Sequence, residues 1–547
     1  MAEEPVWWKR GIVYQVYPRS FMDSDGDGTG DLPGVTQRLD YLQWLGVDAL
    51  WLSPFYLSPM ADFGYDVADY CDVDPLFGTL ADFDALVDEA HRRGLKVLVD
   101  LVPNHTSDQH AWFQESRTSR DNPKRDWYLW ADPAPGGGEP NNWLAAFGGS
   151  GWEWDDATGQ YYFHRFLKEQ PDLNWRNPDV RAAMWDAMRF WMERGVDGFR
   201  VDVIWLMSKD DQLRDDPVNP DYIPGDPEWN RVISTYSGGG GQIHEIVREM
   251  RQTVDEYPER VLIGEIYASP EETVSFYGEN LDECHLPFNF HLVTAAWAAR
   301  GFADFIATYD RLVPEGGWPN WVIGNHDQPR IASRVGAEQA RVAAMLLLTL
   351  RGTPTMYYGD EIGMRDVPIP PDRLVDPAGA VNPGMNRDPA RTPMQWDASE
   401  RAGFTTGEPW LPLAADAATA NVAAQRDDPS SMLAFYRRLI ALRQAEPALE
   451  IGDYQEVEAD GDVLADLRRH GDRQFLVALN LGDGSTQLNL ATTGLGGEVV
   501  LSTEGDREGE AVAGSVLLRP HEGVVVAAHG ERRGGDRAMR YDGGLGD

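Results

Sequence analysis

The chain has 547 residues, 42% of them hydrophobic and 11% aromatic, which is enough for a large core and more than one domain. Its net charge of −41 makes nucleic acid and an anionic membrane poor partners, and no run approaches the roughly 20 apolar residues of a membrane span. The excess of acidic residues is expected to form a solvated surface, with adaptation of the host to high salt as the alternative.

The N-terminus and the cysteines bear on the compartment. The first residues, MAEEPVWWKRG, lack the apolar core of a cleaved secretion signal. Cys71 and Cys284 lie far apart in the sequence, and this usage favours a reduced protein over a disulfide-linked one. We therefore expect a cytoplasmic protein that is a monomer or a small homo-oligomer.

Eight short runs in the first 450 residues are predicted as buried parallel strands, because they are apolar, rich in β-branched residues and bounded by glycine or polar residues. They are GIVYQVYP from Gly11, DALWLSP from Asp48, KVLVDLVPN from Lys96, GVDGFRVDV from Gly195, RVLIGEI from Arg260, CHLPFNF from Cys284, NWVIGNHD from Asn320 and TPTMYYGDE from Thr353. Amphipathic segments such as LADFDALVDEAHRRG and VRAAMWDAMRFWMERG lie between most of them and end in Gly, as helices often do. Eight such units predict an α/β fold, a closed (β/α)₈ TIM barrel.

The loop DSDGDGTGD, after the first strand, resembles the first part of an EF-hand-like metal loop. Its expected ligands, at positions 1, 3, 5, 7 and 9, are Asp23, Asp25, Asp27, the backbone carbonyl of Thr29, and Asp31. Residue 34, at position 12, is Gly instead of the usual Glu. Because the acidic groups would repel each other without a cation, we expect a structural Ca²⁺, with Mg²⁺ as the second choice. An ordinary Asp/Gly turn without metal is the alternative.

Two long interruptions break the βα alternation. Residues 105–173 are rich in Trp, Gly, Pro and Asn, and are predicted to form an inserted lobe over the mouth of the third strand. Residues 208–241 form a long insertion after the fourth strand, and long loops in compact enzymes are usually functional or disordered. The barrel is therefore expected over 1–104 and 174–450, with both interruptions on its catalytic face.

The character of the sequence changes near residue 451. Short alternating runs such as FLVALNL, VVLSTE and GVVVAA predict an antiparallel β-domain over 451–530. The segment 531–547 is Gly-rich and charged, and we expect a disordered tail there.

Three acidic residues lie where predicted strands end: Asp202 in GVDGFRVDV, Glu265 in RVLIGEIY and Asp327 in WVIGNHDQPR. The carboxyl ends of the strands carry the active site of a (β/α)₈ barrel. One such residue would more often be a structural cap or ion-pair partner. Three of them, each in a dense polar motif, suggest a nucleophile, an acid/base and an orienting group for sugar chemistry.

The neighbours of these residues fit those roles. Arg200 lies two residues before Asp202 on the same strand face, so it is expected to lower the pKa of Asp202 and keep that group ionised, as a nucleophile must be. Glu265 follows a glycine that leaves room for a ligand, and partial burial would let it keep its proton as a general acid. His105 and His326 are candidate donors to sugar hydroxyls, although a single His is more often structural.

The motifs DLVPNH, GFRVDV, GEIY and NHDQPR, in this order, resemble the signature blocks of the α-amylase family, glycoside hydrolase family 13. The runs GIVYQVYPRSF and GTPTMYYGDEIGM also look like blocks of that family, and the likeness covers roughly residues 5–530. It implies a (β/α)₈ catalytic barrel, a lobe inserted after the third strand and a C-terminal antiparallel β-sandwich. It also implies that Asp202 is the nucleophile, Glu265 the acid/base and Asp327 the stabiliser of the transition state.

Three further motifs, QPDLNW, DFGYDVADY and ARTPMQWD, look like those of the exo-acting α-glucosidase and oligo-1,6-glucosidase branch. The substrate-binding residues that this resemblance implies are Asp62, Tyr65, His105, Arg200, His326 and Arg391. Asp62 and Arg391 would grip the terminal glucose as a pair of opposite charges, and Tyr65 would be a stacking platform. The metal loop is likewise similar to one in this branch. The run VIWLMSKDD departs from the VINF-type run of oligo-1,6-glucosidases, so the preferred linkage stays open.

The sequence therefore predicts a retaining exo-α-glucosidase whose partner is a small oligosaccharide. The alternative is a transglucosylase or a trehalose synthase-type isomerase of the same family, because the same residues serve both and only the access of water differs. A third class is a non-catalytic relative such as an amino-acid-transporter heavy chain. Such a relative would have a membrane anchor and would usually lack the three carboxylates.

Overall fold

The computed structural model describes residues 6–491 and 494–530, so the predicted tail at 531–547 lies outside the described residues. Eight parallel strands close into a barrel in the order β1-β13-β12-β11-β10-β9-β5-β2. Their bounds are β1 Val13–Val16, β2 Ala49–Leu52, β5 Lys96–Leu101, β9 Gly198–Val201, β10 Val261–Ile266, β11 Leu286–Asn289, β12 Asn320–Val322 and β13 Thr353–Tyr357. All eight predicted strands, and the barrel they imply, are confirmed.

Helices form where the amphipathic segments predicted them. The two segments quoted above are α5, Leu80–Arg92, and α7, Pro178–Glu193. Thr79 begins α5 with a reciprocal capping box. Gly94 and Gly195 follow the two helices with φ of 76° and 97°, a left-handed conformation that glycine adopts without a steric penalty. Further helices around the barrel are α3 Leu32–Gln37, α4 Leu39–Leu45, α8 Ile243–Asp255, α9 Pro270–Ser275, α11 Ala299–Leu312, α13 Ala337–Thr349 and α16 Met432–Ala445.

The barrel interior is filled with side chains. Trp51, Leu98, Ile263 and Phe288 belong to one buried apolar cluster inside it, as expected for a barrel of eight strands. A second and larger cluster fills the space between the strands and the surrounding helices. The barrel interior is therefore a packed core and not a channel.

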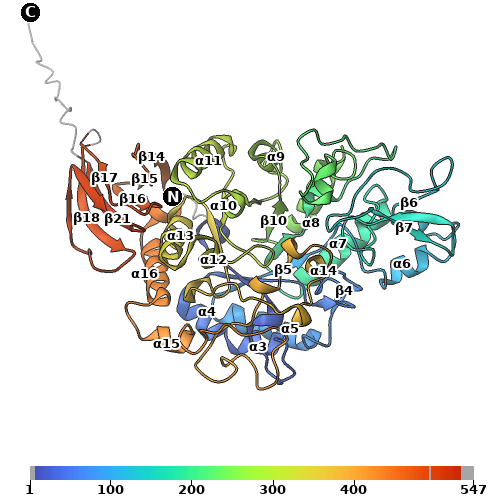
Figure 1. Cartoon of the computed structure of the whole chain (residues 1–547), viewed down its shortest axis with the longest axis horizontal. Helices are drawn as coiled ribbons and strands as arrows, with labels where there is room; N and C mark the ends of the chain where they lie inside the picture. Colours follow the sequence, from blue (N-terminus) through green and yellow to red (C-terminus); the bar gives the residue numbers. More distant parts are fainter. Residues whose placement is uncertain (1–5, 492–493, 531–547) are drawn as a thin grey trace, which may run out of the picture.

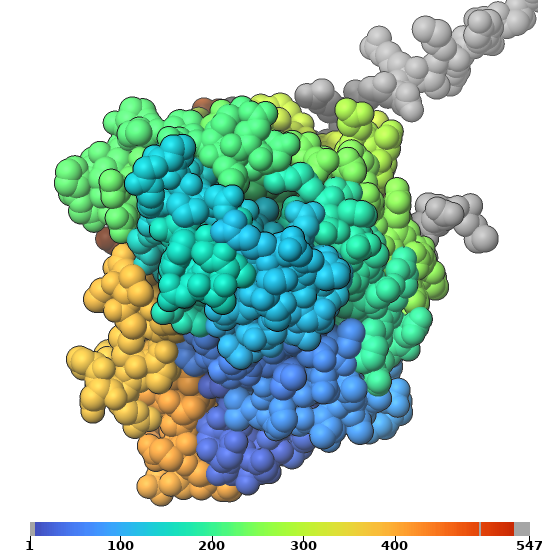
Figure 2. Space-filling view, turned by 90° about the vertical axis from the view of Figure 1, so that its right-hand side faces the viewer, coloured from blue at the N-terminus to red at the C-terminus, as the bar shows by residue number. Residues whose placement is uncertain are grey.

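The inserted lobe lies between β5 and α7, at the opposite end of the molecule from the C-terminal sheet (Figure 1). It contains α6 Ala111–Ser116 and a small sheet of β6 Trp130–Ala131, β8 Gln160–Phe163 and β7 Trp152–Asp155. The insertion 208–241 has little regular structure apart from the 3₁₀ turn η3, Glu228–Arg231. It lies against the lobe, because Nε1 of Trp143 donates to the carbonyl of Arg214 at 2.9 Å. Figure 2, which views the molecule from the right-hand side of Figure 1, shows the lobe (cyan) beside the insertion (green).

The residues after α16 include the antiparallel β-domain that the sequence predicts. One sheet has the order β14-β15-β16-β21-β18-β19, and β17 pairs with β20. The bounds are β14 Asp453–Glu456, β15 Val463–His470, β16 Arg473–Asn480, β17 Thr486–Asn489, β18 Leu495–Ser502, β19 Ala511–Ala513, β20 Ser515–Leu518 and β21 Gly523–Gly530. Side chains of both sheets, such as Leu476 and Leu488, share one core. The exact domain bounds given above stay predictions.

Within the described ranges, no helix has both the length and the apolar character that crossing a bilayer requires.

Candidate active site

A cavity of about 580 Å³ opens at the mouth of the barrel, a size that is usual for ligand sites. Its walls come from the strand ends, the lobe, the insertion and residues 366–390 after β13, which we call the strap. The predicted site residues that line it are Asp62, Tyr65, His105, Asp202, Glu265, His326 and Asp327. Arg200 and Arg391 are fully buried and do not line it.

Asp202 and Glu265 are held by one arginine. Asp202 follows β9, and Glu265 lies in β10, the neighbouring strand. From β9, Nη1 of Arg200 lies 2.9 Å from Oδ1 of Asp202, and Nη2 lies 2.7 Å from Oε1 of Glu265. The same Nη1 is 2.8 Å from Oδ1 of Asp100, at the end of β5. One cation therefore faces three buried carboxyl groups.

This imbalance of charge sets the protonation of the pair. Burial raises the pKa of Asp202 and of Glu265, and the charge of Glu265 raises that of Asp202 further. Arg200 lowers both but does not overcome burial, so the expectation that it would hold the pKa of Asp202 below its ordinary value is wrong. The two carboxyl groups instead titrate as a pair. With one proton, such a pair supplies one acid and one carboxylate.

Asp327 has the opposite environment. Burial would raise its pKa, but His326, Arg391 and Arg387 together lower it below the ordinary range. Nη2 of Arg391 lies 2.9 Å from Oδ1 of Asp327, and Nη1 of Arg387 lies 3.6 Å from the same oxygen. A carboxylate that is fixed as an anion beside the pair can stabilise positive charge developing in the cavity.

Tyr65 and the two histidines form one hydrogen-bonded wall. The Tyr65 hydroxyl lies 2.7 Å from Nε2 of His326 and donates to Asp100 at 3.1 Å. Nε2 of His105 lies 3.1 Å from both the carbonyl of Tyr65 and the side-chain amide of Gln170. Burial lowers the pKa of both histidines, so they are neutral near pH 7, and their ring nitrogens are engaged by Gln15, Tyr65, Asn104 and Gln170.

Asp62 does not pair with Arg391 as expected. Its Oδ1 lies 2.7 Å from Nη2 of Arg387, whereas Arg391 bonds Asp327 behind the cavity wall. The physical reason is the short 3₁₀ turn η7, Asp388–Ala390, between the two arginines. This turn directs the first guanidinium into the cavity and the second beneath it.

Sequence reasoning therefore missed Arg387. Its guanidinium lies among three carboxylates, since it also contacts buried Asp376 at 2.7 Å. The sequence contains a signal for it, because NRDPAR places Arg387 four residues before Arg391. Also missed were the apolar residues of the wall: Phe147, Phe166, Trp205, Leu206, Trp229 and Tyr267.

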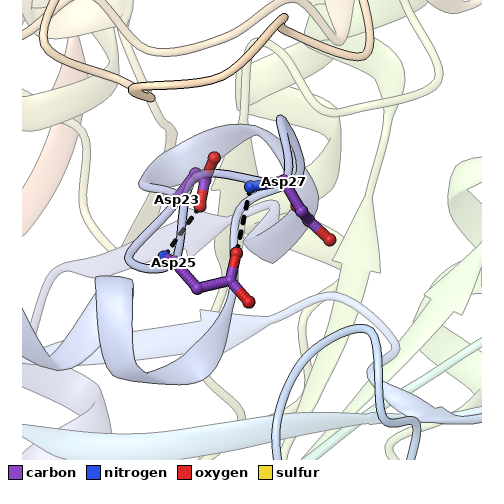
Figure 3. Close-up of side chains that lie close together, drawn as sticks. All are labelled: Asp23, Asp25 and Asp27. Atoms are coloured by element: carbon purple, nitrogen blue, oxygen red, sulfur yellow. Dashed lines mark hydrogen bonds between the residues drawn. The ribbon is translucent and has the colours of Figure 1, made fainter.

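Three side chains of the acidic loop converge. Asp23, Asp25 and Asp27 each offer a carboxylate oxygen, and these oxygens lie within 4.8 Å of one another (Figure 3). Thr29 lies in the same turn, where its N–H donates to Oδ1 of Asp27 at 2.7 Å. Hard oxygen donors in this arrangement fit Ca²⁺ or Mg²⁺.

Asp31 does not join this group, in contrast to the expected ligand set. Its Oδ1 accepts the N–H of Gly34 at 2.6 Å and so caps the N-terminus of α3. Its other oxygen accepts the N–H of Ser24 at 2.9 Å. Both oxygens are thus engaged in ending the loop and starting a helix.

Comparison with known proteins agrees with this geometry. The family description "Alpha amylase, catalytic domain" matches residues 15–452. The chain is 43% identical over 494 residues to a probable alpha-glucosidase of Rhizobium meliloti, covering 87% of this chain and 90% of that protein. It is 40% identical over 519 residues to an oligo-1,6-glucosidase of Parageobacillus thermoglucosidasius, covering 88% and 91%. A solved structure of the alpha-glucosyl transfer enzyme XgtA superposes with a TM-score of 0.90 at 41% identity, covering 96% of this chain and 100% of that one.

Proposed function

The chain belongs to the alpha-amylase family, glycoside hydrolase family 13, and from this premise we propose that it is a retaining exo-acting α-glucosidase. It would release α-glucose from the non-reducing ends of short oligosaccharides. The observation that carries the proposal is the arrangement of Asp202, Glu265 and Asp327 around one cavity, with Arg200 bridging the first two.

The proposed reaction has two displacements at the anomeric carbon. In the first, the Asp202 carboxylate bonds to that carbon while the glycosidic C–O bond breaks, and the departing oxygen takes the proton of Glu265. In the second, Glu265 takes a proton from water, the water oxygen bonds to the same carbon, and the bond to Asp202 breaks. Asp327, kept ionised by its cationic neighbours, stabilises the oxocarbenium-like transition states. Two inversions leave the α-configuration retained.

Exo action is supported by the closed end of the cavity. The Asp62–Arg387 ion pair joins the loop between β3, Tyr56–Leu57, and β4, Asp69–Val73, to the strap, and both side chains line the cavity wall. We assign to Arg387 the gripping role that the sequence suggested for Arg391. The lobe and the insertion roof the remaining sides, so one terminal glucose fits and the interior of a long chain does not.

The second candidate is a transglucosylase or isomerase of the same family. It is supported by the likeness to a glucosyl transfer enzyme and by the apolar part of the wall, where Trp205, Trp229 and Tyr267 could hold an acceptor and limit water. The first displacement is the same in both cases. The products from maltose separate the two: glucose alone, or trehalose and longer sugars.

We further propose that Asp23, Asp25 and Asp27 hold one structural Ca²⁺, or Mg²⁺ in its place. The ion would stabilise the turn after β1 and take no part in the reaction. A cytoplasmic location and a monomer or small homo-oligomer complete the proposal.

The test uses Asp202→Asn, with exposed Asp211→Asn on the insertion as a matched control. We expect wild type and control to cleave 4-nitrophenyl α-glucoside and maltose and to act little on soluble starch, with α-glucose as the first anomer seen by NMR. Isomaltose is expected to be cleaved too. Asp202→Asn should remove activity without lowering the melting temperature, because an amide is a poor nucleophile. Retained activity would refute the assignment of Asp202, and a rapid loss of starch viscosity would refute exo action.

A further inference from the structure

The residue after Asp202 has an unusual backbone. Val203 has φ of 37° and ψ of 44°, in the left-handed region. Among the described residues, the other non-glycine positions with positive φ are Met60, Phe63, Leu213, Glu259, Leu281, Ala402 and His521, none of them β-branched. A β-branched residue there is a genuine outlier, and such outliers cluster at functional sites.

The left-handed conformation sets the direction of the Val203 N–H. It turns the chain from β9 into the 3₁₀ turn η2, Ile204–Leu206, and the N–H of Val203 then donates to Oε2 of Glu265 at 2.9 Å. The other oxygen of Glu265, Oε1, lies 2.7 Å from Nη2 of Arg200. The carboxyl group is therefore held on both oxygens, by a cation on one side and by a main-chain N–H on the other.

A main-chain N–H can only donate, so it favours the carboxylate over the acid. Burial and the nearby charge of Asp327 raise the pKa of Glu265, while Arg200 and the Val203 N–H lower it. Asp202 and the hydroxyl of Tyr267 also face this group. An acid/base must give up its proton in one step and recover one in the next, so both its protonated and its ionised form must be accessible near the working pH.

We propose that the main chain at Val203 is a positioning group for Glu265. Its left-handed turn holds the N–H against Oε2, fixes the orientation of the carboxyl group and keeps its ionised form accessible for the second displacement. This inference rests on the proposed role of Glu265.

The direct test replaces the Val203 N–H by oxygen through incorporation of 2-hydroxyisovalerate, which leaves the side chain intact. The readout is the pH dependence of kcat/KM for maltose, whose leaving group needs a proton. Loss of the N–H donor should raise the pKa of Glu265. The alkaline limb of the profile, where kcat/KM falls with rising pH, should therefore shift to higher pH by about one pH unit. The kcat at neutral pH should fall, because the base in the second displacement is ionised less often. An alkaline limb in the wild-type position would overturn the inference.

Two controls separate this effect from general damage. The same ester at Val201, in β9, removes an N–H from the barrel strand itself, and it should lower the melting temperature without moving the limb. Val203→Gly keeps the N–H and tolerates the left-handed turn, so its limb should also stay in place. Movement of the limb in Val203→Gly would assign the effect to the side chain and overturn the inference.

A second measurement does not need the ester to fold. In the wild type, the Val203 N–H should exchange slowly with deuterium, and Glu265→Ala should accelerate it while strand amides of β9 are unchanged. Equal exchange in both proteins would overturn the inference. Activity retained in Glu265→Gln would instead refute the proposed function, because it would remove Glu265 from the reaction.

Discussion

At the scale of single residues, Arg387 is the group on which the closed end of the cavity depends. Its guanidinium is almost fully buried between Asp62 and Asp376, each with an oxygen 2.7 Å from Nη2. Arg387→Ala would leave two buried carboxylates without their cation, which costs on the order of 2–5 kcal/mol of interaction free energy at this wall of the cavity. We expect kcat/KM for maltose to fall by a factor of about 30 or more. Arg373→Ala, on the same strap, removes an exposed pair with Glu408 and should leave kcat/KM near the wild-type value, and an equal loss there would contradict this role.

The sequence predicted some residues of the site and not others, for a physical reason. Asp202 and Glu265 lie at the ends of regular strands, where the period of the strand fixes the direction of a side chain. Arg387 and Arg391 flank an irregular turn, where no period tells which one faces the cavity. The pKa of Asp202 differs from the prediction because burial and the charge of Glu265 raise it, while Arg200 is shared among three carboxyl groups.

At the scale of elements, the loop after β1 makes a prediction about metal. A bound Ca²⁺ stabilises the folded state by an amount that grows with its concentration, about 2.7 kcal/mol at a hundred times Kd. Chelation should therefore lower the melting temperature while the rate at low temperature changes little. Asp25→Ala should abolish the response to Ca²⁺, whereas Asp31→Ser should keep it, because serine preserves the cap of α3. If metal analysis finds no bound divalent ion and chelation leaves the melting temperature unchanged, the loop is an ordinary turn without metal.

The elements themselves show where sequence patterns carry information. The eight strands were found because a buried strand must be apolar along its whole length. Spacing alone predicts Asp31 as a ligand, but in the structure Asp31 caps α3. The Pro33 that follows within two residues marks a helix start, and it could have identified the cap. The insertion 208–241 has no period, and its packing against the lobe depends on contacts such as Trp143 to Arg214.

At the scale of the whole molecule, buried arginines join the barrel to the C-terminal domain. Arg468 in β15 donates to the barrel carbonyls of Thr349 and Leu449, and Arg443 in α16 also donates to that of Leu449. Both guanidinium groups are fully buried. Burial lowers the pKa of Arg443 to about 9 and of Arg468 to about 10. The junction therefore places two cations in the interior, where the charges of Glu450 and Asp48 act on Arg443 and those of Asp466 and Asp310 act on Arg468, so its stability depends on these ionisable groups.

Asp466, two residues before Arg468, determines whether stability rises or falls with pH. Burial raises its pKa to about 7, so the folded state binds a proton that the unfolded state, with an ordinary carboxyl group, releases near pH 4. Its contribution to stability is thus full below about pH 4 and is lost as pH rises to and through 7, by about 2.6 kcal/mol between pH 5 and 8. Asp48 and Asp360, with pKa raised by burial to about 6 and about 7, act in the same direction.

Asp466→Asn, which mimics the protonated group in both states, should therefore match the wild type only below about pH 4 and should exceed it in stability by a margin that grows from pH 5 to pH 8. Melting temperatures measured across this range at constant ionic strength test it, and constant ionic strength matters because the net charge of −41 makes repulsion sensitive to screening. Asp472→Asn, at an exposed turn of the same domain, is the matched control and should follow the wild-type pH profile. If Asp466→Asn falls as steeply with pH as the wild type, Asp466 is ionised throughout and the charge of Arg468 is balanced by it.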